Sequence, residues 1–64
     1  MFYNVAKIAE YDSRQLLLIK GPDDIPMVSV YDEHTGHTVM RACISNYDNM
    51  KHALVVLETG VDNG

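Results

Sequence analysis

Cysteine is nearly absent from this chain, and long apolar runs are missing altogether. Cys43 is the only cysteine among 64 residues, so no disulfide can form within the chain, and a lone cysteine is typical of a reducing compartment. Apolar runs such as residues 16–19 are far shorter than the roughly 20 residues of a membrane-spanning helix. Lys7, Glu10 and Asp12 interrupt the start of the chain, which argues against a secretory signal. We therefore expect a cytoplasmic protein without a membrane partner.

Positive charge is also scarce. Five lysines and arginines stand against nine aspartates and glutamates, for a formal net charge of −4. Such a balance repels a phosphate backbone, so duplex DNA is not an expected partner. The hydrophobic share of 47% is that of a folded protein rather than a disordered one. The length suffices for one domain with a thin core, and we predict a single α+β domain over residues 1–64.

Four segments have the composition of β-strands. Residues 2–11 are rich in aromatic and branched side chains, and strict alternation would place Val5 and Ala9 on the face opposite Ala6 and Ile8. A short helix is the alternative for this segment. Residues 15–20, 27–31 and 37–44 follow as further strands, separated by the Gly-Pro-Asp-Asp sequence and by a polar turn at residues 32–36.

The last segment has the strongest helical pattern. Ser45 is a suitable N-cap, and Asp48 three residues later completes a capping-box pattern. Gly60 is placed to end the helix. The predicted fold is a small antiparallel sheet of three to four strands, meander-like, with this helix packed on one face. The apolar stripe expected to face the sheet consists of Tyr47, Met50, Ala53, Leu54 and Leu57.

The second strand suggests an interaction surface. Residues 15–19 place apolar side chains on both faces of the sheet, a pattern typical of strands that are buried on both sides. Since one helix covers one face, we expect a second copy of the chain (a homodimer) or another protein to cover the other. The alternative is that the strand twists and its spare side chains lie under the loop at residues 21–25. The expected contact face consists of Tyr3, Leu17, Tyr31, Val39 and Arg41.

Catalytic and metal-binding arrangements are poorly supported. His34 and His37 lie near Asp32 and Glu33, but the spacing does not match that of known zinc sites and the turn contains a flexible glycine. Cys43 would need a neighbouring base to act as a nucleophile. The glycines form no phosphate-binding motif. We expect no metal, no cofactor and no catalytic residue.

Three functions remain, in order of support. The first is a non-enzymatic interaction protein that binds a protein partner, of unknown identity, through a sheet face or edge. In size and acidity the chain is similar to the small regulators and inhibitors that phages and plasmids encode. The second is a single-stranded nucleic-acid-binding module that uses Tyr3 and Tyr31 with Lys7 and Arg41. The third is a small enzyme or metal protein centred on His34, His37 and Cys43.

Overall fold

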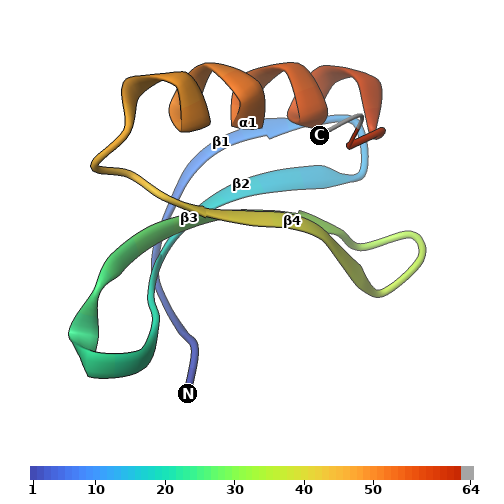
Figure 1. The fold of residues 1–64 in the computed structure, drawn as a ribbon. Helices are drawn as coiled ribbons and strands as arrows, with labels where there is room; N and C mark the ends of the chain where they lie inside the picture. Colours follow the sequence, from blue (N-terminus) through green and yellow to red (C-terminus); the bar gives the residue numbers. More distant parts are fainter. Residues whose placement is uncertain (63–64) are drawn as a thin grey trace.

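A four-stranded antiparallel sheet carries one helix across one of its faces (Figure 1). The computed structural model describes residues 1–62. The strands are β1 (Tyr3–Tyr11), β2 (Arg14–Lys20), β3 (Pro26–Asp32) and β4 (His37–Cys43), and α1 (Tyr47–Thr59) follows them; a short 3-10 turn, η1 (Pro22–Asp24), joins β2 to β3. The strands lie side by side in chain order. The predicted α+β meander with a C-terminal helix is confirmed.

The two inner strands pair regularly, whereas both outer strands are bulged. β2 and β3 pair without interruption from Arg14 opposite Asp32 to Lys20 opposite Pro26. β1 contains two extra residues, Val5 and Ile8, and β4 contains one, Val39. Each bulge shifts the alternation of side chains between faces. The strict alternation expected in β1 is therefore wrong.

The core lies between α1 and the face of the sheet that it covers. Ala6 and Ala9 of β1 pair with Leu18 and Leu16 on this side. Leu16, Val28 and Val30 are almost completely enclosed. The remaining buried members of the cluster are Met40 from β4 and Ala53, Val56 and Leu57 from the helix, with Ala9, Val39, Ala42, Ile44 and Met50 packed around them.

Helix α1 begins one residue later than the sequence suggests. Asn46, not Ser45, is the N-cap, and its side-chain oxygen accepts a 2.9 Å hydrogen bond from the N–H of Asp48. Both residue types are good N-caps, so their order alone does not decide between them. The stripe is also rotated: Tyr47 and Leu54 are exposed. The run at residues 53–57 is apolar on every side, so it does not specify which face packs inward.

The helix ends where the sequence predicts. Gly60 has a left-handed φ of 75°, and its N–H donates to the Val56 carbonyl at 2.7 Å. Arg14 of β2 reaches the same end: Nε donates to the carbonyl of Leu57 at 2.7 Å, and Nη2 donates to that of Glu58 at 2.8 Å. A guanidinium here meets the negative end of the helix dipole. One side chain thus joins the inner sheet to the end of the helix.

Within residues 1–62, no helix has the length and apolar character needed to cross a membrane.

The turn between β3 and β4 is organised by Asp32. Its carboxylate accepts hydrogen bonds from the backbone N–H of His34 at 2.8 Å and from the Ser13 hydroxyl at 3.0 Å. Partial desolvation, the largest single influence, would raise the pKa of Asp32. The hydrogen bonds from His34, Ser13 and Thr35, with the charge of Arg14, outweigh it and hold the pKa below its usual 3.8. The ionised carboxylate therefore favours the folded turn.

Candidate functional site

The face of the sheet turned away from α1, here called the open face, is formed by alternate residues of the strands. Leu16, Val30 and Met40 pair across β2, β3 and β4 on the helix side. Their neighbours point the other way, because successive strand residues alternate between faces. Leu17 lies opposite Ser29, which lies opposite Arg41. The centre of the open face therefore combines an apolar, a hydroxyl and a cationic side chain.

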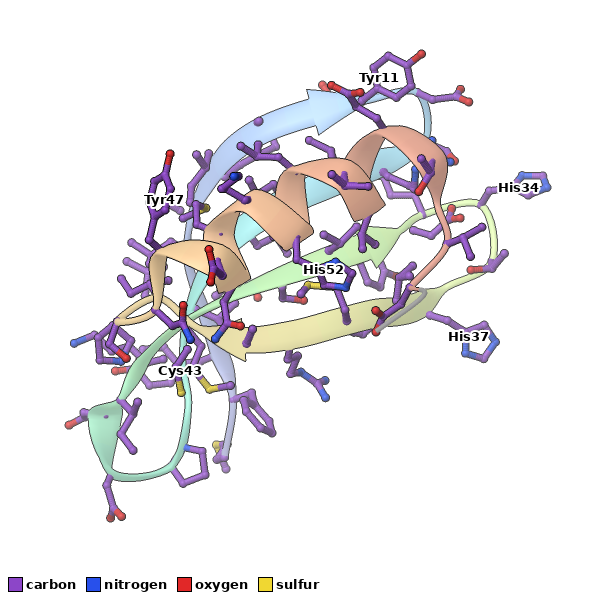
Figure 2. The ribbon with its side chains drawn as sticks, turned by 45° about the horizontal axis from the view of Figure 1, so that its top comes forward. Tyr11, His34, His37, Cys43, Tyr47 and His52 are labelled. Carbon is purple, nitrogen blue, oxygen red and sulfur yellow. The ribbon has the colours of Figure 1, made fainter. Side chains whose placement is uncertain are left out.

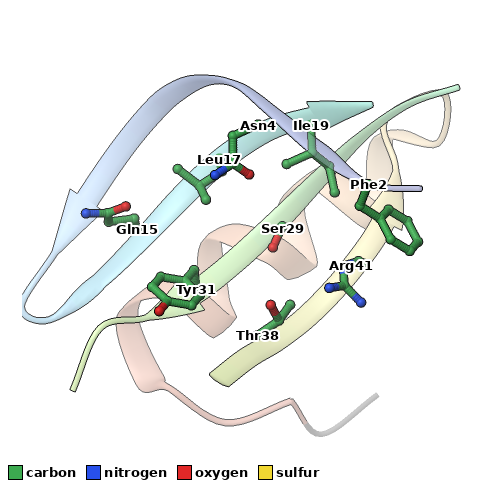
Figure 3. A pocket seen from close by; sticks show the side chains of 9 residues that line it. All are labelled: Phe2, Asn4, Gln15, Leu17, Ile19, Ser29, Tyr31, Thr38 and Arg41. Atoms are coloured by element: carbon green, nitrogen blue, oxygen red, sulfur yellow. The ribbon is translucent and has the colours of Figure 1, made fainter. Parts of the chain in front are cut away.

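A hollow of about 300 Å³ occupies this face (Figure 3). Its lining comes from all four strands and the residue before β1. The lining residues are Phe2, Asn4, Gln15, Leu17, Ile19, Ser29, Tyr31, Thr38 and Arg41. None of the nine is a histidine, a carboxylate, a cysteine or a lysine. The hollow therefore offers hydroxyls, amides, aromatic rings and one guanidinium on an apolar floor.

The floor of the hollow is already buried within one chain. Leu17 is 9% exposed, Ile19 2% and Ser29 4%. At the end of β2, Gly21 leaves room for Met27 and Phe2, because a Cβ there would lie 2.7 Å from the Met27 sulfur and 3.3 Å from the Phe2 ring. Both faces of β2 are thus buried, as its sequence predicts, but without a second copy of the chain. This removes the main argument for a homodimer.

Arg41 is the cation of the hollow. Its guanidinium lies over the ring of Phe2, 4.3 Å from the ring centre, in a cation–π contact. The ion pairs within residues 1–62 involve other groups: Lys7 with Glu10 at 3.5 Å, and His52 with Asp62 at 2.6 Å. Among those residues, therefore, no carboxylate neutralises Arg41.

Several hydroxyl groups around Arg41 also lack partners. Within residues 1–62, the side chains of Ser29, Tyr31 and Thr38 make no hydrogen bond. No fully enclosed side-chain oxygen or nitrogen in that part of the chain is unsatisfied, so the hydroxyl of the buried Ser29 must reach the hollow. At the rim, Gln15 donates a 2.6 Å hydrogen bond to Glu33. The hollow thus presents donors that the described chain does not use.

Three of the five residues expected in a contact face line this hollow, and two do not. Leu17, Tyr31 and Arg41 come together. Val39 is the bulged residue of β4 and packs against the core. Tyr3 lies outside the hollow, where its hydroxyl donates to Asp24 at 3.1 Å. This hydrogen bond, with partial desolvation and the charge of Asp24, raises the pKa of Tyr3 above its usual 10.0.

Sequence reasoning missed the other lining residues. Strict alternation with Val39 and Arg41 would place Thr38 on the helix side, but the bulge at Val39 turns Thr38 into the hollow. Ser29 gave no signal beyond its alternation with Val28 and Val30, and the position of Phe2 depends on how the chain enters β1. A bulge is set by local geometry rather than by composition, so one sequence offers little warning of it.

The histidines and the cysteine do not converge. His34 and His37 point outward from the hairpin tip, whereas Cys43 is at the opposite end of β4 (Figure 2). His52 lies on α1. Within residues 1–62, no three histidine, cysteine, aspartate or glutamate side chains are grouped closely enough to hold a metal ion.

Comparison of the chain with family models, with curated proteins and with solved structures found no match. The candidate site is therefore assigned from geometry alone.

Proposed function

We propose that this chain is a small non-enzymatic interaction domain that binds a protein partner through the open face of its sheet. The observation that carries the proposal is the hollow, in which Tyr31, Arg41 and the Ser29 hydroxyl have no hydrogen-bond partner among residues 1–62 and lie on an apolar floor. Tyrosine and arginine are favoured at the centres of protein interfaces, because they bury much area and keep a polar end for hydrogen bonding.

The face is a better docking surface than either edge. Both outer strands are bulged, at Val5 and Ile8 in β1 and at Val39 in β4. Bulges interrupt the row of backbone donors and acceptors that an added strand would need. We therefore propose docking by side chains into the hollow rather than addition of a strand.

A catalytic role has less support from this geometry. The nine lining residues lack the histidine, carboxylate, cysteine or lysine that general acid–base and nucleophilic catalysis most often use. A role as a regulator or inhibitor of a partner, in the cytoplasm, fits a domain of this size. The exposed free thiol of Cys43 suits a reducing compartment.

Binding of single-stranded nucleic acid is the second candidate. Phe2, Tyr31 and Arg41 share the hollow and are residue types that stack on bases. Against it, Lys7 is paired with Glu10, Tyr3 lies outside the hollow, and the net charge is −4. Binding to a short oligonucleotide that weakens steeply with salt would favour this candidate.

The proposal is tested by site-specific crosslinking. A photoreactive amino acid replaces Tyr31 in the hollow or, as the control, Tyr47 on the exposed side of α1. We expect position 31 to capture a protein from the source cells, and position 47 to capture none. We also expect Tyr31→Ala and Arg41→Gln to weaken binding of that protein by about thirtyfold each, the effect of losing an interface hot spot. Capture from position 47 alone, or binding unchanged in both variants, would refute docking on the open face.

A further inference from the structure

The unpaired donors of the hollow point to the chemistry of the partner. We propose, on the basis of the protein-binding function above, that the hollow receives a single glutamate side chain from an extended segment of the partner. Arg41 and Ser29 would bind its carboxylate, and the apolar floor would contact its methylene groups.

Arg41 is arranged to bind an anion. The Phe2 ring, 4.3 Å away, contacts the guanidinium through its face, which leaves the N–H groups in the guanidinium plane as donors. Arginine binds carboxylates with two parallel hydrogen bonds. On a chain with a formal charge of −4, acidic side chains are plentiful, yet no described carboxylate pairs with this cation. Its local charge is therefore available to a partner's carboxylate.

Ser29 supplies a second donor beside the guanidinium. It lies directly opposite Arg41 across β3 and β4, so the two Cβ atoms are about 5 Å apart. Ser29 is 96% buried, since its exposed fraction is 4%, and its hydroxyl has no partner within residues 1–62. No fully enclosed side-chain oxygen in residues 1–62 lacks a partner, so this hydroxyl opens into the hollow and is free to donate to an incoming group. An oxygen atom of the partner would accept hydrogen bonds from both Ser29 and Arg41.

The shape and floor of the hollow select a carbon-bearing acid over a free anion. Its volume of about 300 Å³ is at the low end of ligand sites and admits single side chains rather than a folded element. Leu17 and Ile19 form an apolar floor, which contacts methylene groups favourably and phosphate unfavourably. Glutamate has two methylene groups before its carboxylate and so matches both parts of the hollow.

One carboxylate of the chain, Glu33, lies at the far rim of the hollow. Its carboxylate accepts a hydrogen bond from Gln15. Gln15 precedes Leu17 by two residues on β2, so the two Cα atoms are about 7 Å apart along the extended strand. Glu33 therefore lies beside the Tyr31 end of the hollow rather than the Arg41 end. An incoming carboxylate at Arg41 and Ser29 is kept apart from it.

The test uses two short peptides that differ in one charge. Acetyl-Ala-Leu-Glu-Leu-Ala-amide and its glutamine counterpart are titrated into the ¹⁵N-labelled chain and followed by NMR. We expect the glutamate peptide to shift the Arg41 side-chain Nε–H signal and the Ser29 amide. We expect it to bind about tenfold more tightly than the glutamine peptide, the value of one charge-assisted hydrogen bond. Arg41→Gln should abolish the difference, and the matched control Lys51→Gln on α1 should retain it.

Each contrary outcome has a distinct meaning. Equal binding of the two peptides would overturn the carboxylate assignment. The proposal that the hollow receives a glutamate would be refuted if neither peptide binds. It would also be refuted if inorganic phosphate or a short oligonucleotide shifts the same NMR signals more strongly than the glutamate peptide does. The crosslinking experiment tests protein binding independently of this inference. If the captured protein binds the Arg41→Gln variant normally but does not bind the Tyr31→Ala variant, protein binding through the open face stands and the glutamate assignment is refuted.

Discussion

Replacing Arg14 by alanine removes the side chain that joins β2 to the end of α1. The wild-type guanidinium donates hydrogen bonds of 2.7 and 2.8 Å to the carbonyls of Leu57 and Glu58. Hydrogen bonds to a charged group contribute about 1.5–3 kcal/mol, and a cation at a helix C-terminus adds about 0.3–1 kcal/mol. Arg14 is only half-buried, so we expect a loss of about 2–3 kcal/mol in the free energy of unfolding.

That loss is large for a domain of this size. A chain of 64 residues has a total stability of about 3–10 kcal/mol, and each kcal/mol moves its Tm by about 4–8 °C. We expect Arg14→Ala to lower the Tm, followed by circular dichroism, by about 8–24 °C. Arg14→Lys should be intermediate, because lysine keeps the charge but loses the planar pair of donors.

The matched control is the other arginine on a strand. Arg41 contacts the ring of Phe2 and caps no helix, so Arg41→Ala should lower the Tm by much less than Arg14→Ala. If the two variants melt at the same temperature, the bridge between Arg14 and the helix does not contribute as described, and the stability of the helix end must come from Gly60 and the core.

Three further predictions concern stability. Leu17→Ala should lower the unfolding free energy in urea by about 2–3 kcal/mol, because Leu17 is 9% exposed within one chain; an unchanged midpoint would contradict its burial. Gly60→Ala should lower the Tm more than Gly36→Ala. Both glycines have φ of 75°, but a Cβ at Gly60 would lie 2.9 Å from Arg14 Nη1 whereas one at Gly36 meets nothing; equal losses would contradict the contact. The pKa of Asp32 is depressed below 3.8, so its contribution is present above about pH 4 and is lost as the pH falls through the folded pKa. In the Asp32→Asn variant, the free energy of unfolding should therefore fall less steeply as the pH is lowered below about 4 than it does in the wild type. An unchanged pH dependence in this range would contradict the role of Asp32.

The strand pattern and turn residues were sufficient to predict the fold, because they repeat over several residues. Gly36 and Gly60 mark the last hairpin and the helix end, and both have left-handed backbone conformations there. The helix face was not predictable, since Ala53 to Leu57 is apolar throughout. Only packing against the sheet selects Val56 and Leu57 as buried and leaves Leu54 outside.

The candidate site was predictable only in its inner strands. Leu17 and Tyr31 lie on β2 and β3, where pairing is regular and alternation predicts the face correctly. On β4 the bulge at Val39 exchanges the expected positions of that residue and Thr38. Leu17 is buried without a second chain by tertiary packing, which no periodic pattern in the sequence encodes.

The meander order has a consequence for how the chain folds. Each strand pairs with the one before it, so the sheet can form hairpin by hairpin from local contacts, which favours rapid folding. The bonds from Arg14 to Leu57 and Glu58 instead span 43 and 44 residues. During synthesis the sheet would therefore precede its helix and expose Leu16, Val28 and Val30 until α1 arrives. Because α1 follows all four strands in the chain, its docking is the step that covers these side chains, whose exposure favours aggregation.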